Sequence, residues 1–204
     1  MLVKKGILKN RRTKTYDVFT KCITSDFTSD PTLPITMKSS DYVKECWKRY
    51  VRGCTKRSNA LNGNIFETII ATELYRQEIK PFYTQSTVLF VPGVEYDIVL
   101  YDMVKHAPVV LSMKTSARER FKQADLEAVA LKYVHRKSET FFVMKSSKES
   151  TNLKNKLKSG EILGISEIIE ADSTDMNSMI DRLRSYYKFG EAPEEKIIRG
   201  NFVN

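Results

Sequence analysis

Three short runs of β-type sequence follow one another closely in the middle of the chain, and they constrain the fold more than any other feature. They cover residues 82–91, 95–102 and 109–113. Pro92-Gly93 separates the first two runs, and His106-Ala107-Pro108 separates the last two. β-branched and aromatic residues bounded by such turn residues are typical of strands, and short connections favour pairing between sequential strands. We therefore predict a strand meander at the centre of the fold.

Helical patterns flank this meander. Apolar residues recur at helical spacing in four segments, which predicts helices over about 40–51, 64–77, 116–133 and 173–187. Ser40 fits the N-cap of the first helix and Ser173 or Thr174 that of the last. A polar helix over 148–157 and two more strands, over 140–144 and at the sheet edge over 162–169, complete the pattern. This order predicts an α/β fold with a mixed central β-sheet flanked by helices.

Length and composition indicate one globular domain. The chain has 204 residues, of which 41% are hydrophobic, and this is enough for a buried core. No apolar run approaches the roughly 20 residues of a bilayer span, and the basic N-terminus lacks the apolar block of a signal peptide. The three cysteines are odd in number and lack metal-ligand spacing, so they indicate no disulfide framework. We expect a cytoplasmic protein without a membrane partner.

The positive charge of the chain is concentrated near its N-terminus. Residues 1–60 hold 14 Lys and Arg against 5 Asp and Glu, a net charge of +9, whereas the remaining residues hold 20 of each sign. Residues 1–37 show no sustained period, which predicts an irregular arm. A basic lobe suits a polyanion such as nucleic acid, because each neutralised phosphate releases counterions. A solvated basic face explains the charge equally well, so charge alone leaves both interpretations open.

Candidate chemistry lies at the ends of the predicted strands. The chain has no G-x-S-x-G elbow, no phosphate-binding loop and no G-x-G-x-x-G. Asp97 lies inside an apolar strand, where a buried carboxylate needs a partner or a metal. Lys114 ends the next strand with Ser112 on the same side, so adjacent strands can bring Asp97 and Lys114 together. The following helix places Glu127 near inward-facing apolar residues.

Two carboxylates and a lysine around one point suit a divalent cation with oxygen ligands. Such a cation polarises a phosphate and lowers the pKa of a bound water, while the lysine assists that nucleophile. From spacing alone, the same three residues also fit a strand end, a solvated lysine and a carboxylate on a helix surface. The spacing therefore leaves a catalytic and a purely structural interpretation open.

The same residues resemble the PD-(D/E)XK nuclease motif. Asp97 followed by Ser112-Met113-Lys114 matches the motif, and segment 114–123 is similar to the EcoRII and PspGI branch of type II restriction endonucleases. In that branch and in NgoMIV-like relatives, Ser or Thr replaces the acid two residues before the lysine. The following helix supplies an acid instead. Ser112 and Glu127, thirteen positions after Lys114, match this arrangement.

The resemblance covers about residues 63–132, a third of the chain, and implies a role for each matching residue. It implies a restriction-endonuclease-like core in which Asp97 and Glu127 bind Mg²⁺. Lys114 would assist the attacking water. Glu67 matches the upstream helical glutamate of the family and would support the site or a second metal.

The resemblance also implies how DNA is read. Arg118, Glu119 and Arg120 match a motif that reads a CC/GG element in the related enzymes. Arginine can donate two hydrogen bonds to guanine, and a carboxylate can accept one from cytosine. Ser112 and Gln123 are further predicted DNA contacts. An ordinary charged helix start is the alternative for this motif.

These implications predict a type II site-specific deoxyribonuclease. A Mg²⁺-dependent homodimer would cut both strands of double-stranded DNA at a short palindromic site and leave 5′-phosphates. The chain would form one endonuclease domain, with a basic arm and helix over 1–60, the catalytic core over 61–145 and a C-terminal completion over 146–204. Two alternatives are a repair or structure-specific nuclease of the same fold and a non-catalytic DNA-binding module that works through its basic lobe.

Overall fold

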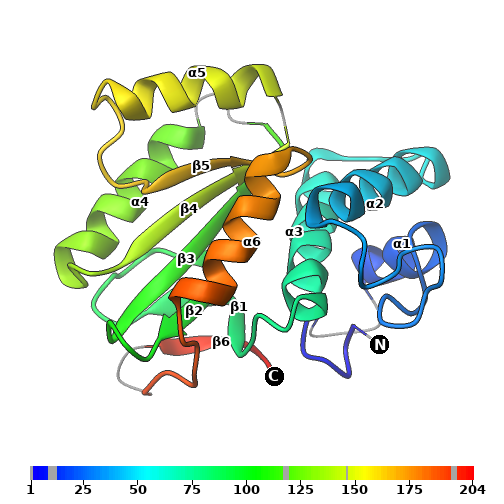
Figure 1. Ribbon diagram of the computed structural model, residues 1–204, viewed down its shortest axis with the longest axis horizontal. Coiled ribbons are helices and arrows are strands. Elements are labelled where there is room, and N and C mark those ends of the chain that lie inside the picture. The colour runs from blue at the N-terminus through cyan, green and yellow to red at the C-terminus, as the bar shows by residue number, and fades with distance from the viewer. Residues whose placement is uncertain (1, 9–12, 117–119, 146, 194–196) are drawn as a thin grey trace.

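A six-stranded mixed β-sheet forms the centre of the computed structural model, which describes residues 2–8, 13–116, 120–145, 147–193 and 197–204. The strands lie in the order β5-β4-β3-β2-β1-β6 (Figure 1). Their bounds are β1 Phe82–Val88, β2 Tyr96–Asp102, β3 Ala107–Lys114, β4 Glu139–Met144, β5 Glu167–Glu170 and β6 Ile197–Val203. The helices of the described residues are α1 Lys14–Cys22, α2 Ser39–Gly53, α3 Asn59–Arg76, α4 Arg120–Val134, α5 Ser147–Lys158 and α6 Thr174–Tyr186.

The topology confirms the predicted strand meander and the mixed α/β class. β1 pairs antiparallel with β2, and β2 pairs antiparallel with β3, in a register that sets Ile98 opposite Leu111. β3, β4 and β5 run parallel, because α4 and α5 return the chain between them. The carboxyl ends of β3 and β4 therefore meet at one edge of the sheet, where Lys114 lies opposite Met144.

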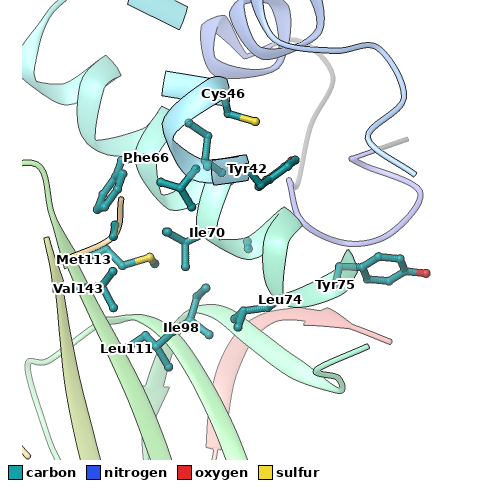
Figure 2. Packing of buried hydrophobic residues seen from close by; sticks show 14 of the residues in the cluster. Tyr42, Cys46, Phe66, Ile70, Leu74, Tyr75, Ile98, Leu111, Met113 and Val143 are labelled. Carbon is teal, nitrogen blue, oxygen red and sulfur yellow. The ribbon is translucent and has the colours of Figure 1, made fainter. Parts of the chain in front are cut away.

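Helices cover both faces of this sheet. α1, α2, α3 and α6 share the main hydrophobic core on one face, whereas α4 and α5 pack on the other. Figure 2 shows Ile70 and Leu74 of α3 between Cys46 of α2 and Leu111 of β3. Because α3 lies between α2 and the sheet, it is buried on nearly all sides from Ile65 to Arg76. This packing fixes the position of α3 and therefore the backbone from which its polar side chains project.

The N-terminal segment contains a helix, α1, so the predicted irregular arm over residues 1–37 is wrong for residues 14–22. α1 begins after Thr13, whose hydroxyl accepts a hydrogen bond from the backbone N–H of Tyr16 at 3.1 Å. Phe19 and Ile23 are buried in the main core. The helix is short, and Phe19 with the C-cap residue Ile23 is its one buried apolar pair four residues apart. That pair is too little to establish a period in the sequence.

The last strand, β6, has no counterpart in the sequence prediction. It pairs antiparallel with β1 and forms one edge of the sheet. Gly200 and Asn201 in its second half are turn-type residues, which conceal the strand pattern. Gly200 is required by a close approach, because a Cβ atom there would lie 1.9 Å from Ser86 Oγ.

The helix ends agree with the prediction at α6 and differ at α2. Ser173 caps α6 and accepts a hydrogen bond from the backbone N–H of Asp175 at 3.2 Å. Ser40 is not the N-cap of α2, because the helix begins at Ser39 and Ser40 instead exchanges hydrogen bonds with Asn177. Within the described part of the chain, no helix combines the length and apolarity that crossing a membrane requires.

Candidate active site

The antiparallel register of β2 and β3 brings Asp97 and Lys114 together, as the sequence predicted. Lys114 Nζ lies 3.2 Å from Asp97 Oδ2, and the side chains are 27% and 13% exposed. The same Oδ2 also accepts a hydrogen bond from the backbone N–H of Met113 at 2.6 Å. A charged donor and a backbone donor on one oxygen fix this carboxylate at the strand ends. Both of these contacts are made by Oδ2.

Glu67 reaches the same place from α3. Burial, followed by the negative charge of Asp97, raises the pKa of Glu67 to about 8, and the positive charge of Lys114 opposes this shift. The Oε2 atom of Glu67 accepts a hydrogen bond from Gln85 Nε2 at 2.8 Å. A strongly raised carboxyl pKa in a cleft is typical of functional sites. The structure therefore brings together three of the predicted residues: Asp97, Lys114 and Glu67.

Two cavities open on this group. They share Asn64, Glu67 and Met113 in their walls. The first has a volume of about 360 Å³ and is lined by Asp97, and the second has a volume of about 470 Å³ and is lined by Lys114. A molecule in either cavity can therefore reach the carboxyl group of Glu67.

Gln85 and Glu95 also line the first cavity, and the sequence analysis missed both. Glu95 lies two residues before Asp97, and residues two apart in a strand share one side. The sequence therefore contained a signal for Glu95. Gln85 gave no such signal, because its direction depends on an irregular backbone in β1 that alternation alone does not show.

Glu127 lies apart from this group. It projects from α4, which packs on the face of the sheet opposite to α3. Its half-buried carboxylate accepts a hydrogen bond from Gln123 Nε2 at 2.8 Å, and it lines neither cavity. Its neighbours Ala124 and Ala128 are buried. A side chain that is buried on the α4 face of the sheet is not thereby close to Asp97.

The predicted DNA contacts have different surroundings. Ser112 is buried in β3 with 6% of its surface exposed, whereas Gln123 is exposed on α4. Arg118 and Glu119 lie outside the described residues. Arg120 begins α4, and its side chain also lies outside the described part.

The donor set at Asp97 and Glu67 fits Mg²⁺. This cation is usually held by one or two carboxylates, while waters and substrate phosphate oxygens complete an octahedron. Asp97 and Glu67 supply two carboxylates at the walls of open cavities. Among the described residues, no three His, Cys, Asp or Glu side chains lie close enough together to hold a metal by themselves. Asp97 and Glu67 alone would not fill the coordination sphere of Mg²⁺. Water and substrate oxygens would have to supply the remaining ligands.

Comparisons with known proteins give no further indication of function. No family profile, no curated protein and no solved structure matches this chain. The interpretation of the site follows from its residues and their geometry.

Proposed function

We propose that this chain is a Mg²⁺-dependent deoxyribonuclease that hydrolyses double-stranded DNA at a short specific site. The observation that carries the proposal is the group of Asp97, Lys114 and Glu67 beside two open cavities. A mixed sheet with α3 on one face and α4 on the other is compatible with a restriction-endonuclease-like core. A carboxylate and a lysine on adjacent strand ends, with a further acid on a helix, suit phosphodiester hydrolysis.

Each residue has a task that follows from its chemistry. When bound, Mg²⁺ supplies a Lewis acid that polarises the scissile phosphate and lowers the pKa of a bound water. Asp97 and Glu67 would hold this cation through carboxylate oxygens. Lys114 orients the attacking water and stabilises negative charge that develops on the phosphate. Attack on phosphorus breaks the P–O3′ bond and leaves 5′-phosphate and 3′-hydroxyl ends.

A plasmid digest tests the proposed function. In MgCl₂ we expect a fixed set of fragments whose ends share one sequence in run-off sequencing, and EDTA should abolish cleavage. Fragment ends at random positions or at branched structures would instead indicate a repair or structure-specific nuclease. DNA binding without cleavage in MgCl₂ or MnCl₂ would overturn the proposal in favour of a DNA-binding module.

Lys114 offers a sharp variant test with a matched control. Lys154 forms an ion pair with Asp175 and lines neither cavity. We expect Lys114→Ala to lower the single-turnover cleavage rate by at least about 100-fold, because it removes a charge at the reacting phosphate. Lys154→Ala should cut at nearly the wild-type rate. Near-normal cutting by Lys114→Ala would contradict the assignment.

The proposed specificity assigns a CC/GG step to Arg118, Glu119 and Arg120. Lys114, Thr115 and Ser116 line the second cavity, and this motif follows them directly in the chain. Replacing either arginine by Ala should cost about 1–3 kcal/mol of discrimination per lost bidentate contact. Cleavage of duplexes in which each G·C pair is changed in turn measures this loss. Unchanged rate and sequence preference in both arginine variants would place recognition elsewhere.

A further inference from the structure

The side chains of β1 do not alternate regularly between the two faces of the sheet. Phe82 belongs to the core on the α3 face, whereas Val88 belongs to the core on the α4 face. Residues six apart in a regular strand share one face, so the alternation must break between them. The pairing of β1 with β6 shifts register between Thr84 and Thr87 and again between Thr87 and Val88, so the strand is irregular in this part.

Gln85 is at the centre of this irregularity. Its φ of 50° lies in the left-handed region, which is unfavourable for a residue with a side chain. Thr84 and Gln85 are sequential, yet both line the cavity beside Asp97. In a regular strand one of them would point to the opposite face. The irregular backbone therefore turns Gln85 into the cavity.

The neighbouring strand is adapted to the same irregularity. Gly200 of β6 lies so close to Ser86 that a Cβ atom there would displace the Ser86 hydroxyl and crowd its Cβ at 3.0 Å. β6 thus provides a glycine beside the residue that follows Gln85. Two strands accommodate this unfavourable backbone, which indicates that the position of the Gln85 side chain matters.

Gln85 Nε2 donates a hydrogen bond to Glu67 Oε2 at 2.8 Å. Within the described part of the chain, Glu67 has no other hydrogen-bond donor. A carboxyl group on a flexible side chain needs such a contact to keep one orientation in an open cavity. The bond occupies Oε2 and leaves Oε1 for a cation or a water.

We propose that Gln85 is a positioning residue that holds the Glu67 carboxyl group in the orientation needed for binding the divalent cation. This inference rests on the proposed function, because it assigns Gln85 a part in the same site. Gln85 acts through Glu67 and does not touch the reacting phosphate. Its removal should therefore weaken cation binding and catalysis without a matching loss of DNA affinity.

The test compares Gln85→Met with Gln77→Met. Methionine is similar in length to glutamine and lacks the donor. Gln77 Nε2 donates a similar bond to Glu73 Oε1 at 2.9 Å at the other end of α3, so it is a matched control. We expect Gln85→Met to lower the single-turnover rate about tenfold and to raise the half-saturating MgCl₂ concentration several-fold. DNA affinity in CaCl₂ should change less than twofold, and Gln77→Met should leave all three values near wild type.

A double-variant cycle separates positioning from a general structural role. If Gln85 acts through Glu67, adding Gln85→Met to Glu67→Gln should cause no further loss of rate or of Mn²⁺ affinity in calorimetric titrations. Equal losses in the wild-type and Glu67→Gln backgrounds would overturn the inference. Gln85→Gly relieves the left-handed backbone, so it should melt at or above the wild-type temperature and still show the tenfold loss of rate.

The outcomes for the two proposals are distinguishable. A wild-type protein that cuts no DNA in MgCl₂ overturns the proposed function, and the Mn²⁺ titrations then test the Gln85–Glu67 coupling by themselves. A wild-type protein that cuts DNA while Gln85→Met matches it in rate and metal dependence overturns only the role of Gln85.

Discussion

At the scale of single residues, the raised pKa of Glu67 links the site to stability. In the unfolded chain Glu67 releases its proton near the ordinary value of 4.5, whereas in the folded protein it holds the proton up to about 8. The unfolded state therefore binds fewer protons between these two values, and this residue lowers the stability of the fold as the pH rises from 4.5 to 8. Above pH 8 Glu67 is ionised in the folded protein too, and the loss of folding stability has reached its full size.

Glu67→Gln should remove this pH dependence, because the amide stays neutral and its oxygen can still accept the bond from Gln85. We expect the variant to melt about 10 °C above the wild type at pH 8.5 and at the same temperature at pH 4.5. For a protein of this size, 1 kcal/mol corresponds to about 2–4 °C. Scanning calorimetry at the two pH values checks this expectation, and an equal difference at both would contradict the assigned cause.

Glu67 and Glu127 are both candidates for the second metal-binding acid. The resemblance assigns this role to Glu127, but the geometry places Glu67 beside Asp97 and leaves Glu127 with Gln123 on α4. We therefore expect Glu67→Gln to lower the cleavage rate by about 100-fold or more and Glu127→Gln by less than about tenfold. A collapse of cleavage in Glu127→Gln with near-normal cutting by Glu67→Gln would return the role to Glu127.

At the scale of elements, local sequence patterns predicted the strands and pairings that depend only on neighbouring parts of the chain. Alternation and turn residues were sufficient for β1, β2 and β3, and their pairing followed from the short connections. The meeting of Asp97 and Lys114 was therefore predictable. The meander needed no information from distant parts of the chain.

The elements that the sequence did not reveal depend on distant contacts. β6 carries Gly200 and Asn201 and is a strand because β1 offers it an open edge. The direction of Gln85 depends on an irregularity in β1 that appears in its pairing with β6. Glu127 was placed near Asp97 because its helix is partly apolar. The helical pattern alone does not say which face of the sheet the helix covers.

The basic side chains of α2 divide into structural and exposed groups. Arg49 forms ion pairs with Asp30 and Glu45, so it holds α2 to the preceding loop. Lys44, Arg52 and Lys56, in and just after α2, are exposed instead.

Replacing Lys44, Arg52 and Lys56 by Gln should weaken binding to all DNA sequences. If they contact phosphates, the slope of log K against log salt should fall by about one per lost contact. Binding titrations across salt concentrations measure this slope. Arg49→Gln should mainly lower the melting temperature. An unchanged slope in the triple variant would show that this face is merely solvated.

At the scale of the whole molecule, the basic segment and the candidate site are adjacent. α1 and α2 belong to this segment and pack against α3, the helix that bears Glu67 (Figure 1). Part of the predicted irregular arm is thus the helix α1, which packs on the same face of the sheet as α3. Ile7, Leu8, Thr13 and Thr15 line the first cavity, so this part of the chain borders the candidate site.

One site of this kind cuts one strand, so a double-strand break needs two sites. A palindromic target is most simply read by a dimer with twofold symmetry, in which each copy presents the same elements to one half-site. We therefore expect two protomers on each cleavable duplex in sedimentation experiments. Mixed dimers of wild type and Lys114→Ala should nick a supercoiled plasmid at the site and not linearise it, because one half lacks its lysine. Linear product from these mixed dimers, or one protomer on a cleavable duplex, would show that a single copy cuts both strands.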